Sequence, residues 1–384
     1  MHDGRDLRVL DWLRAHEQEM TVALDRLVRA ESPSLDPAAQ EQGLELLARE
    51  LRRVCYVPRR IRGREDGNHL FARPDRCRAH AGHQLVIGHL DTVWPLGSVK
   101  RNPPRIENGR LYGPGSYDMK GGVVQLVFAL RALQALRREP PITPAILVTS
   151  DEETGSMDSR RYIRMLARGA VRAFVLEPPD GARGELKTGR KGVGRFRVAV
   201  HGRAAHAGAC PEEGVSAILE LSHQIQRLFA MNDGHAGVTV NVGTIQGGLM
   251  PNVIAPEASA RVDVRAPTPE AAVVIERAIR SLTPVHAHVA ITVEGGFSHP
   301  PMPQTVRNRK LYRRARELAR ALGFDIGEAP VVGGASDANL ASELTATLDG
   351  LGAVGGGAHA ADEHVVLEAL PERAALLALL LLEP

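Results

Sequence analysis

Cysteine is scarce in this chain, which has three, Cys55, Cys77 and Cys210. An odd number cannot form a closed set of disulfides, and no two of them have the CxxC spacing of a structural zinc site. The sequence therefore argues against a disulfide-stapled secreted module. We expect three reduced thiols in a cytoplasmic protein.

Aromatic residues and one-sided charge are also lacking. Aromatics make up 4% of the 384 residues, and 48 basic residues nearly balance 45 acidic ones, for a net charge of +3. A nucleic-acid-binding surface would need basic residues gathered on one face, together with aromatics that stack on bases. Neither pattern is visible, so we expect no nucleic-acid partner.

Long apolar runs are absent as well. The first twenty residues are charged and helix-like, and they contain no continuous apolar stretch of signal-peptide length. The apolar run Ala374–Leu382 is too short to span a bilayer and fits the end of a packed helix. We therefore expect a cytoplasmic protein with no membrane partner.

What is present, between residues 84 and 178, is the pattern of an α/β domain. Three short apolar runs bounded by loops are typical of strands buried on both faces of a sheet: Gln84–His89, Ala145–Ser150 and Ala173–Leu176. Between the first two, Gly121–Leu136 has apolar residues at helical spacing. Polar residues follow each strand, and sites in open α/β sheets form outside the carboxyl ends of strands. We expect the chemistry there.

A second pattern begins after Lys187. Gly194–Gly202 alternates between apolar and polar residues, as a half-exposed strand does. A helix, two strands, a helix and a strand are expected next, in this order: Glu212–Phe229, Val238–Ile245, Ala258–Arg265, Pro269–Leu282 capped by Thr268, and His288–Glu294. This is the βαββαβ order of a ferredoxin-like domain, whose four-stranded sheet carries two helices on one face.

The length of the chain favours two or three domains, and the patterns give two. Helices expected at Arg307–Leu322 and Leu367–Leu382 would return the chain to the first domain. The prediction is a large, discontinuous α/β catalytic domain with a mainly parallel sheet, residues 1–190 and 300–384. The βαββαβ domain, residues 191–299, is inserted into it.

Seven residues supply the candidate chemistry. They lie in the segments GHLDTVWPLG, GPGSYDMKGG, TSDEETGS, LEPPD and GGGAHAADEHV, and are His89, Asp91, Asp118, Glu152, Glu153, Glu177 and His359. Each has an ordinary alternative, because carboxylates after strands often cap helices and most histidines are surface or core residues. Together they offer the nitrogen and oxygen ligands that zinc and similar divalent ions take.

Their spacing indicates distinct roles. Asp91, two residues after His89, can hydrogen-bond the imidazole nitrogen that does not face the metal. Glu152 and Glu153 are adjacent at a strand end and point in different directions, so one can bind a metal while the other faces the reacting water. Asp118 lies in a glycine-lined turn, where a carboxylate can bridge two ions roughly 3.5–4 Å apart.

These segments resemble the metallopeptidase family that includes bacterial folate-cleaving glutamate carboxypeptidase, aminoacylase, acetylornithine deacetylase and succinyl-diaminopimelate desuccinylase. The motifs HLDTV, GPGSYDMKGG, SDEETGS, GRAAHAG, GGASDA and HAADEH occur in the family's order, and the glutamate carboxypeptidase type is the most similar. The resemblance implies two zinc ions per chain, with cobalt or manganese as alternatives. It assigns one ion to His89, Asp118 and Glu177, and the other to Asp118, Glu153 and His359. It also makes Glu152 the general base and the Asp118–Met119 peptide cis.

The resemblance extends to the inserted domain, which dimerises in relatives and would act as a lid. It implies a homodimer in which His206 reaches across to hold the scissile carbonyl oxygen. Asn252 and Arg265 would lie near the substrate's carboxylate, and Gly334 and Ser336 in the loop that closes around the substrate. Without the resemblance, His206 would be an ordinary turn residue and Arg265 a surface charge.

Three further features bear on this assignment. Where carboxylate-specific relatives often carry an arginine just before a Pro-Pro pair, this chain has His299, which leaves a C-terminal glutamate preference open. His364 is a rival to His359 as a ligand, and the position of Glu363, four residues after His359, favours His359. The GxGxxG match at Gly350–Gly355 lacks the helix and acidic residue of a dinucleotide site, so no such cofactor is expected.

The expected function is hydrolysis of an amide bond next to a free carboxylate, in a small molecule or short peptide. Glu152 would take a proton from water and pass one to the leaving amine, while the zinc ions and His206 stabilise the oxyanion. An N-acyl-amino-acid deacylase uses the same machinery and is the alternative. A silent binding homologue would be expected to have lost Glu152 or a ligand, and this chain keeps them all.

Overall fold

The computed structural model describes residues 4–64, 67–76, 82–181, 183–232, 234 and 236–384, so Cys77 lies outside the described residues. The chain divides into two compact units, of which the first comprises residues 1–189, 304–332 and 336–384. The second, residues 190–303 and 333–335, is an insertion in the sequence of the first. Among the described residues, no helix has the length and apolar character needed to cross a membrane.

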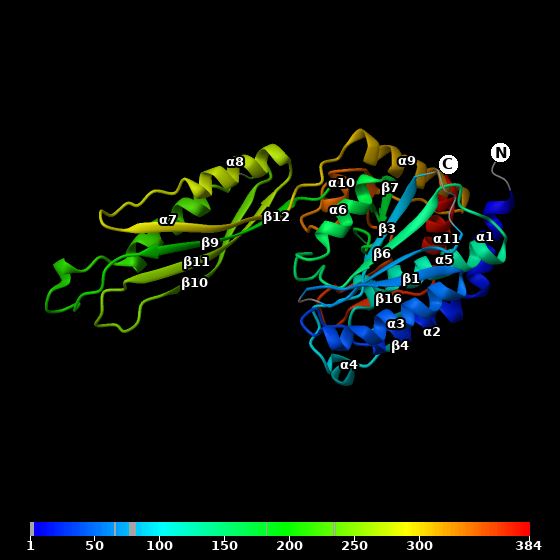
Figure 1. Ribbon diagram of the computed structural model, residues 1–384, viewed down its shortest axis with the longest axis horizontal. Helices are drawn as coiled ribbons and strands as arrows, with labels where there is room; N and C mark the ends of the chain where they lie inside the picture. Colours follow the sequence, from blue (N-terminus) through cyan, green and yellow to red (C-terminus); the bar gives the residue numbers. More distant parts are fainter. Residues whose placement is uncertain (1–3, 65–66, 77–81, 182, 233, 235) are drawn as a thin grey trace. The chain divides into compact units, whose positions relative to one another are not determined.

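The first unit is built on a six-stranded sheet with the order β1-β2-β6-β3-β7-β14 (Figure 1). Its strands are β1 (Tyr56–Ile61), β2 (His69–Pro74), β3 (His83–His89), β6 (Thr143–Thr149), β7 (Ala170–Val175) and β14 (Ala346–Leu348). The last four run parallel, and β1 and β2 add an antiparallel edge. The apolar runs of the sequence form the central strands β6, β3 and β7, which are largely buried. The predicted α/β class with a mainly parallel sheet is confirmed.

Helices cover both faces of this sheet. The helices of the first unit are α1 (Gly4–Ala15), α2 (Glu17–Arg29), α3 (Pro37–Arg53), α4 (Ser98–Arg101), α5 (Gly121–Ala135), α6 (Arg160–Arg168), α9 (Val306–Ala321), α10 (Asp337–Ser342) and α11 (Ala369–Leu382). α5 and α11 pack together and are apolar on nearly all sides, because both are buried along most of their length. Gly88 of β3 faces Val123 of α5, whereas Thr149 of β6 reaches Asp337 of α10. Since Gly88 pairs with Val148, the residue before Thr149, α5 and α10 lie on opposite faces.

Two small sheets complete the first unit. One is antiparallel with the order β15-β16-β5-β4, and the other is the parallel pair β13-β8. Their strands are β4 (Arg105–Glu107), β5 (Arg110–Tyr112), β8 (Leu186–Lys187), β13 (Glu328–Ala329), β15 (Gly355–Gly356) and β16 (His364–Val366). An irregular turn, η1 (Ser116–Lys120), leads from β5 into α5. It contains the cis peptide bond Asp118–Met119, which confirms that prediction.

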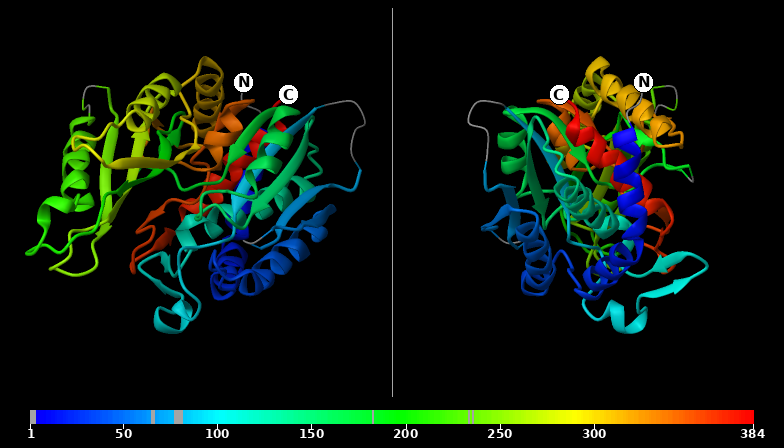
Figure 2. Two further views of the ribbon diagram at one scale, coloured as in Figure 1. Left: turned by 60° about the vertical axis from the view of Figure 1, so that its left-hand side comes forward. Right: turned by 90° about the vertical axis from the view of Figure 1, so that its right-hand side faces the viewer.

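The second unit is an antiparallel sheet with two helices (Figure 2). Its elements are β9 (Gly192–His201), the short turn η2 (Pro211–Glu213), α7 (Ala217–Ala230), β10 (Thr239–Gly247), β11 (Glu257–Ala266), α8 (Pro269–Arg280) and β12 (Ala290–His299). The sheet order is β10-β11-β9-β12, so β10 and β12 are its edges. Every second side chain of β11 is buried against the core, which leaves the other face of the sheet to residues such as Arg261.

In the second unit, α7 and β12 differ most from their predicted bounds. α7 begins at Ala217 rather than Glu212, because the Ser216 side chain caps the helix by accepting a hydrogen bond from a backbone N–H. β12 begins after His288, whose φ of 65° is not that of a strand, and it continues to His299. Both boundaries depend on local backbone geometry that residue patterns report poorly.

Candidate metal centre

The predicted ligands come from segments that end at one edge of the main sheet. β6, β3 and β7 are adjacent and parallel, so their carboxyl ends bring the residues that follow them together. η1 and the loop between β15 and β16 contribute the others. The candidates are His89 at the end of β3, Glu152 and Glu153 after β6, Glu177 after β7, Asp118 in η1 and His359 before β16.

The Asp118 carboxylate lies between the two histidines. Its Oδ1 is 3.3 Å from His89 Nε2, and its Oδ2 is 3.5 Å from His359 Nε2. On the far sides, Glu177 Oε1 lies 3.6 Å from His89 Nε2 and Glu153 Oε2 lies 3.3 Å from His359 Nε2. The arrangement therefore contains two groups of nitrogen and oxygen donors that share one carboxylate.

Three buried atoms of this cluster lack a hydrogen-bond partner within the described part of the chain: His89 Nε2, Asp118 Oδ1 and Glu153 Oε1. Native structures bury few polar atoms unpaired, because doing so costs free energy. Coordination of a divalent cation removes that cost, and imidazole nitrogen and carboxylate oxygen are donors that zinc accepts. The residues present fit a metal cofactor.

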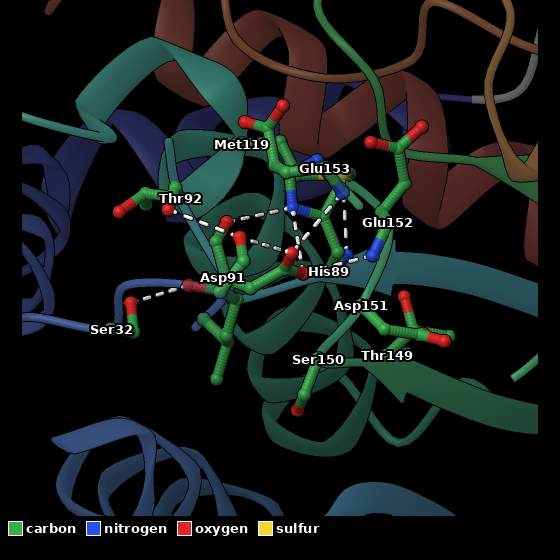
Figure 3. Close-up of polar contacts among 12 residues, drawn as sticks. Ser32, His89, Asp91, Thr92, Met119, Thr149, Ser150, Asp151, Glu152 and Glu153 are labelled. Atoms are coloured by element: carbon green, nitrogen blue, oxygen red, sulfur yellow. Dashed lines mark hydrogen bonds and ion pairs between the residues drawn. The ribbon is translucent and has the colours of Figure 1, made fainter. Parts of the chain in front are cut away.

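The contacts of Asp91 differ from the prediction. His89 Nδ1 lies 2.9 Å from the backbone carbonyl oxygen of Asp91, while the nearest carboxylate oxygen is 3.5 Å away (Figure 3). A carbonyl can only accept, so Nδ1 carries the proton and Nε2 presents its lone pair to the cluster. The Asp91 carboxylate instead accepts hydrogen bonds from Ser34 Oγ at 2.8 Å, Glu152 N at 3.3 Å and Glu153 N at 3.1 Å. Asp91 thus positions both the imidazole and the segment with the two glutamates.

The cluster is strongly negative. Burial raises the pKa of Glu152 well above its usual value, and the charge of Glu177 raises it further. Burial acts in the same direction on Asp118, but the imidazoles of His359 and His89 beside its carboxylate outweigh burial and hold the pKa of Asp118 below its usual range. Hydrogen bonds to Asp118 and Glu153 raise the pKa of His359 to about 10. The carboxylates thus favour positive charge in their midst, which is what a bound cation supplies.

Glu363 has contacts at the site that the sequence did not predict. Its buried carboxylate accepts hydrogen bonds from the backbone N–H groups of Gly115, Tyr117 and Asp118 at 2.8, 3.0 and 3.0 Å. A fourth bond comes from Trp94 Nε1 at 2.8 Å. One side chain therefore holds the turn that presents Asp118. The sequence signal is the position of Glu363 four residues after His359.

The rival histidine, His364, lies in β16 with its Nδ1 2.8 Å from the carbonyl oxygen of Asp362. Its ring packs on Tyr112, with the two centroids 5.1 Å apart. His359, in contrast, makes the contacts to Asp118 and Glu153 described above. Of the two histidines, His359 is the one that the structure brings into the cluster.

The two predicted residues of the GASD loop have internal contacts. Ser336 is fully buried, and its hydroxyl caps α10 by accepting from Ala338 N and donates to Asp349. The carbonyl oxygen of Gly334 accepts a hydrogen bond from Arg190 at 3.0 Å. Through these contacts Ser336 stabilises the start of α10, a role that does not require a substrate.

The remaining predicted residues belong to the second unit. His206 is exposed, and its Nδ1 accepts hydrogen bonds from the N–H groups of Gly208 and Ala209, both at 3.1 Å. The Asn252 carbonyl oxygen accepts from Ala207 N, which places Asn252 beside the His206 segment. The Arg265 guanidinium forms two hydrogen bonds with Asp263, at 2.7 and 3.0 Å.

An α/β sheet with imidazole and carboxylate donors gathered at its carboxyl edge has the architecture of a metal-dependent hydrolase, and comparison with known proteins gives the same class. The sequence profile of peptidase family M20/M25/M40 matches residues 85–383. The chain belongs to this family and is a metal-dependent hydrolase.

The relatives agree on the class of enzyme but differ in activity. The chain is 29% identical to carboxypeptidase G2 of Pseudomonas sp. (strain RS-16), an alignment that covers 94% of this chain and 88% of that protein. It is 31% identical to a succinyl-diaminopimelate desuccinylase of Xanthomonas campestris pv. campestris, over 75% of this chain and 80% of the relative. The fold matches the Bacillus subtilis YXEP protein, a dinuclear metal binding peptidase of the M20 family, with a TM-score of 0.70, 15% identity, and coverage of 96% of this chain and 98% of that one.

Proposed function

We propose that this protein is a two-zinc amide hydrolase that cleaves an amide bond next to a free carboxylate. The observation that carries the proposal is the position of Asp118, whose two carboxylate oxygens face two different histidines. A shared carboxylate is the feature that two-metal hydrolases need. The three reduced cysteines expected from the sequence agree with a cytoplasmic location.

The two groups of donors define how the ions would be held. His89, Asp118 and Glu177 would bind one, and Asp118, Glu153 and His359 the other. Bound there, the ions would polarise the scissile carbonyl and make a water molecule acidic enough to react near neutral pH. Because Nδ1 of His89 is committed to the Asp91 carbonyl, the opposite nitrogen is the one available as a ligand.

Glu152 is the proposed general base. It follows β6, its N–H is held by Asp91, and its pKa is raised by burial and by Glu177. A carboxylate with a raised pKa accepts a proton from water readily and can return it to the leaving amine. Glu153, one position on, points to His359 instead, so the two adjacent glutamates divide the work of base and ligand.

The leading substrate class is an amide or dipeptide with a C-terminal carboxylate, as the identity to carboxypeptidase G2 supports. An N-acyl-amino-acid deacylase is the second candidate. It is favoured by the identity to succinyl-diaminopimelate desuccinylases and by His299, which stands where carboxylate-specific relatives often have an arginine. Arg265 and Asn252 remain candidates for binding the substrate's carboxylate, and Arg265 would have to exchange its bonds with Asp263 to do so.

A substrate panel tests this proposal. The full-length protein, loaded separately with zinc, cobalt and manganese, is assayed on N-acyl amino acids and dipeptides with glutamate, aspartate, lysine or leucine at the released position. Each compound is paired with its C-terminal amide as a matched control. Cleavage of the acids and not of the amides supports the carboxylate requirement. Equal rates on acids and amides would exclude a carboxylate requirement, and no cleavage by any metal form would exclude the proposed substrate class.

We also propose a homodimer through the second unit. β10 is an open sheet edge, and apolar side chains are exposed on and beside it: Ile245, Leu249, Met250, Ile218 and Leu219. Next to them lies a groove of about 660 Å³ lined mainly by apolar residues. A second copy of the chain, pairing its own β10 and covering these side chains, matches both features.

His206 would then complete the partner's site. Because its Nδ1 accepts two backbone hydrogen bonds, its Nε2 carries the proton in the neutral ring and can donate to an oxyanion. His206→Ala and Glu152→Gln should each be nearly inactive, yet their mixture after subunit exchange should regain about a quarter of wild-type activity, since half of the dimers would contain one intact site. Asp118→Ala mixed with Glu152→Gln is the control, because it restores no site. Demonstrated exchange without regained activity would exclude the cross-dimer role.

A further inference from the structure

The loop that carries Glu152 and Glu153 is short and tightly bent. It spans residues 150–156, from the end of β6 to the turn before α6, and Figure 3 shows its first residues following Thr149. Gly155 has a φ of 104° and Ser156 a φ of 54°. A residue with a side chain seldom adopts a positive φ, so contacts from elsewhere must hold Ser156 in this conformation.

Asp337 supplies such contacts at both ends of the loop. The Ser156 hydroxyl donates to Asp337 Oδ1 at 2.5 Å, and the Thr149 hydroxyl donates to Oδ2 at 3.1 Å. Thr149 and Ser156 are fully buried, and Asp337 is 2% exposed. Asp337 is the first residue of α10, so a side chain from a segment distant in sequence ties together the two ends of the loop.

The middle of the loop is held from a different direction. Asp91 accepts hydrogen bonds from the N–H groups of Glu152 and Glu153, and Ser156 N donates to the Asp151 carbonyl oxygen at 2.8 Å. Asp91 thus fixes the backbone of the two glutamates at the edge of the sheet. The bonds to Asp337 set where the loop begins and ends, and all of these contacts together define one conformation.

We propose that Asp337 is a positioning residue for amide hydrolysis, which joins the hydroxyls at the two ends of loop 150–156 and thereby determines where Glu152 and Glu153 lie. The inference rests on the proposed function for the roles of these two glutamates. The family resemblance places Asp337 in the segment Gly334–Asp337, a loop that closes around the substrate. Its burial and its contacts give it a different use, since it acts through Thr149 and Ser156 from inside the first unit.

Four variants and one control separate the contacts. Asp337→Ala removes both acceptor oxygens, whereas Asp337→Asn keeps one and can donate its amide hydrogens to the other hydroxyl. Thr149→Val and Ser156→Ala each remove one donor and leave Asp337 in place. Thr347→Val is the control for Thr149→Val, because Thr347 is also a fully buried threonine of the main sheet and its hydroxyl bonds to the Thr345 carbonyl.

The first measurement does not depend on activity. Amide hydrogen exchange is followed by mass spectrometry on the full-length protein after chelation of metal, in peptides that cover residues 150–156. Asp337→Ala should accelerate exchange there by about tenfold or more. Asp337→Asn, Thr149→Val and Ser156→Ala should give intermediate exchange rates. Thr347→Val should exchange like the wild type. A folded Asp337→Ala variant with unchanged exchange in this loop would overturn the proposal. If that variant does not fold, Thr149→Val and Ser156→Ala decide by the same criterion.

The second measurement distinguishes positioning from general destabilisation. The zinc-loaded variants are assayed on the panel compound that the wild type cleaves fastest. A displacement of about 1 Å can cost about 100-fold in rate, so Asp337→Ala should lower kcat by about 10–100-fold and leave KM within about twofold, with partial rescue by Asp337→Asn. A rise in KM with kcat unchanged would contradict the positioning role of Asp337. An equal loss of kcat in Thr347→Val would contradict it as well. If the wild type cleaves nothing, the proposed function fails, while the exchange experiment still decides whether Asp337 holds the loop.

Discussion

Replacing Glu363 should uncouple the turn of Asp118 from the rest of the site. Glu363 accepts four hydrogen bonds, two at each carboxylate oxygen, and it is 1% exposed. Glu363→Gln keeps one accepting oxygen and puts an amide NH₂ where the other stood. That NH₂ faces two N–H donors, so two buried donors lose their acceptor without any change in side-chain volume.

The magnitude follows from this count. Leaving a buried donor unsatisfied costs about 1–3 kcal/mol, so two orphaned donors should lower the free energy of unfolding of the first unit by about 2–6 kcal/mol. Glu363→Ala orphans all four donors, for about 4–12 kcal/mol, which is comparable to the whole stability of a typical domain. Glu363→Gln is therefore the variant to measure, because we expect the first unit of Glu363→Ala not to fold.

Urea unfolding of the full-length protein after chelation, followed by circular dichroism, gives the free energy. Asp362→Asn is the matched control: Asp362 is the preceding, exposed carboxylate, and its substitution should change stability by no more than about 0.5 kcal/mol. Zinc affinity should also fall by about 10–100-fold in Glu363→Gln, as it does when residues that orient ligands are replaced. A Glu363→Gln variant as stable as Asp362→Asn, with unchanged zinc affinity, would show that Glu363 does not hold the turn of Asp118.

Two further predictions concern carboxylates of the same unit. Asp118→Ala should lose both metal ions, because its oxygens face both histidines, and metal analysis that finds two ions retained per chain would exclude Asp118 as the bridge. Burial raises the pKa of Asp337 to about 7, although the bond from Ser156 lowers it, and in an unfolded chain the value is about 3.9. The contribution of Asp337 to the free energy of unfolding is thus fully present below about pH 4 and is lost as the pH rises through 7. The melting temperature of the wild type minus that of Asp337→Asn should fall between pH 5 and pH 8 after chelation, and a constant difference would show that the folded pKa is not raised.

The central strands could be predicted because continuous apolar runs report burial on both faces directly. β3 and α5 begin or end within one residue of the predicted bounds, and β6 within two. β1 and β2 were not predicted. Pro58 and the neighbouring arginines interrupt the alternation of β1, which an edge strand tolerates because one of its sides pairs with no neighbour.

The ligand candidates could also be predicted, because residues after parallel strands must meet at one edge of a sheet. The residues that hold them could not. Glu363 lies 245 residues from Asp118, and Asp337 lies 181 residues from Ser156, so each pairing depends on the complete fold. Asp91 shows a subtler limit: its spacing from His89 predicted a contact, but the backbone carbonyl makes the shorter one, which leaves the carboxylate for the glutamate loop.

Glu152→Gln is the decisive substitution for the role of general base, because it keeps the size of the side chain and removes its ability to take a proton. Metal content and turnover are measured on the same preparation, with the panel compound that the wild type cleaves fastest. We expect two zinc ions per chain, as in the wild type, and a turnover lower by about 10²–10⁴-fold. A variant that retains its metal and turns over at the wild-type rate would contradict the assignment of Glu152 as general base.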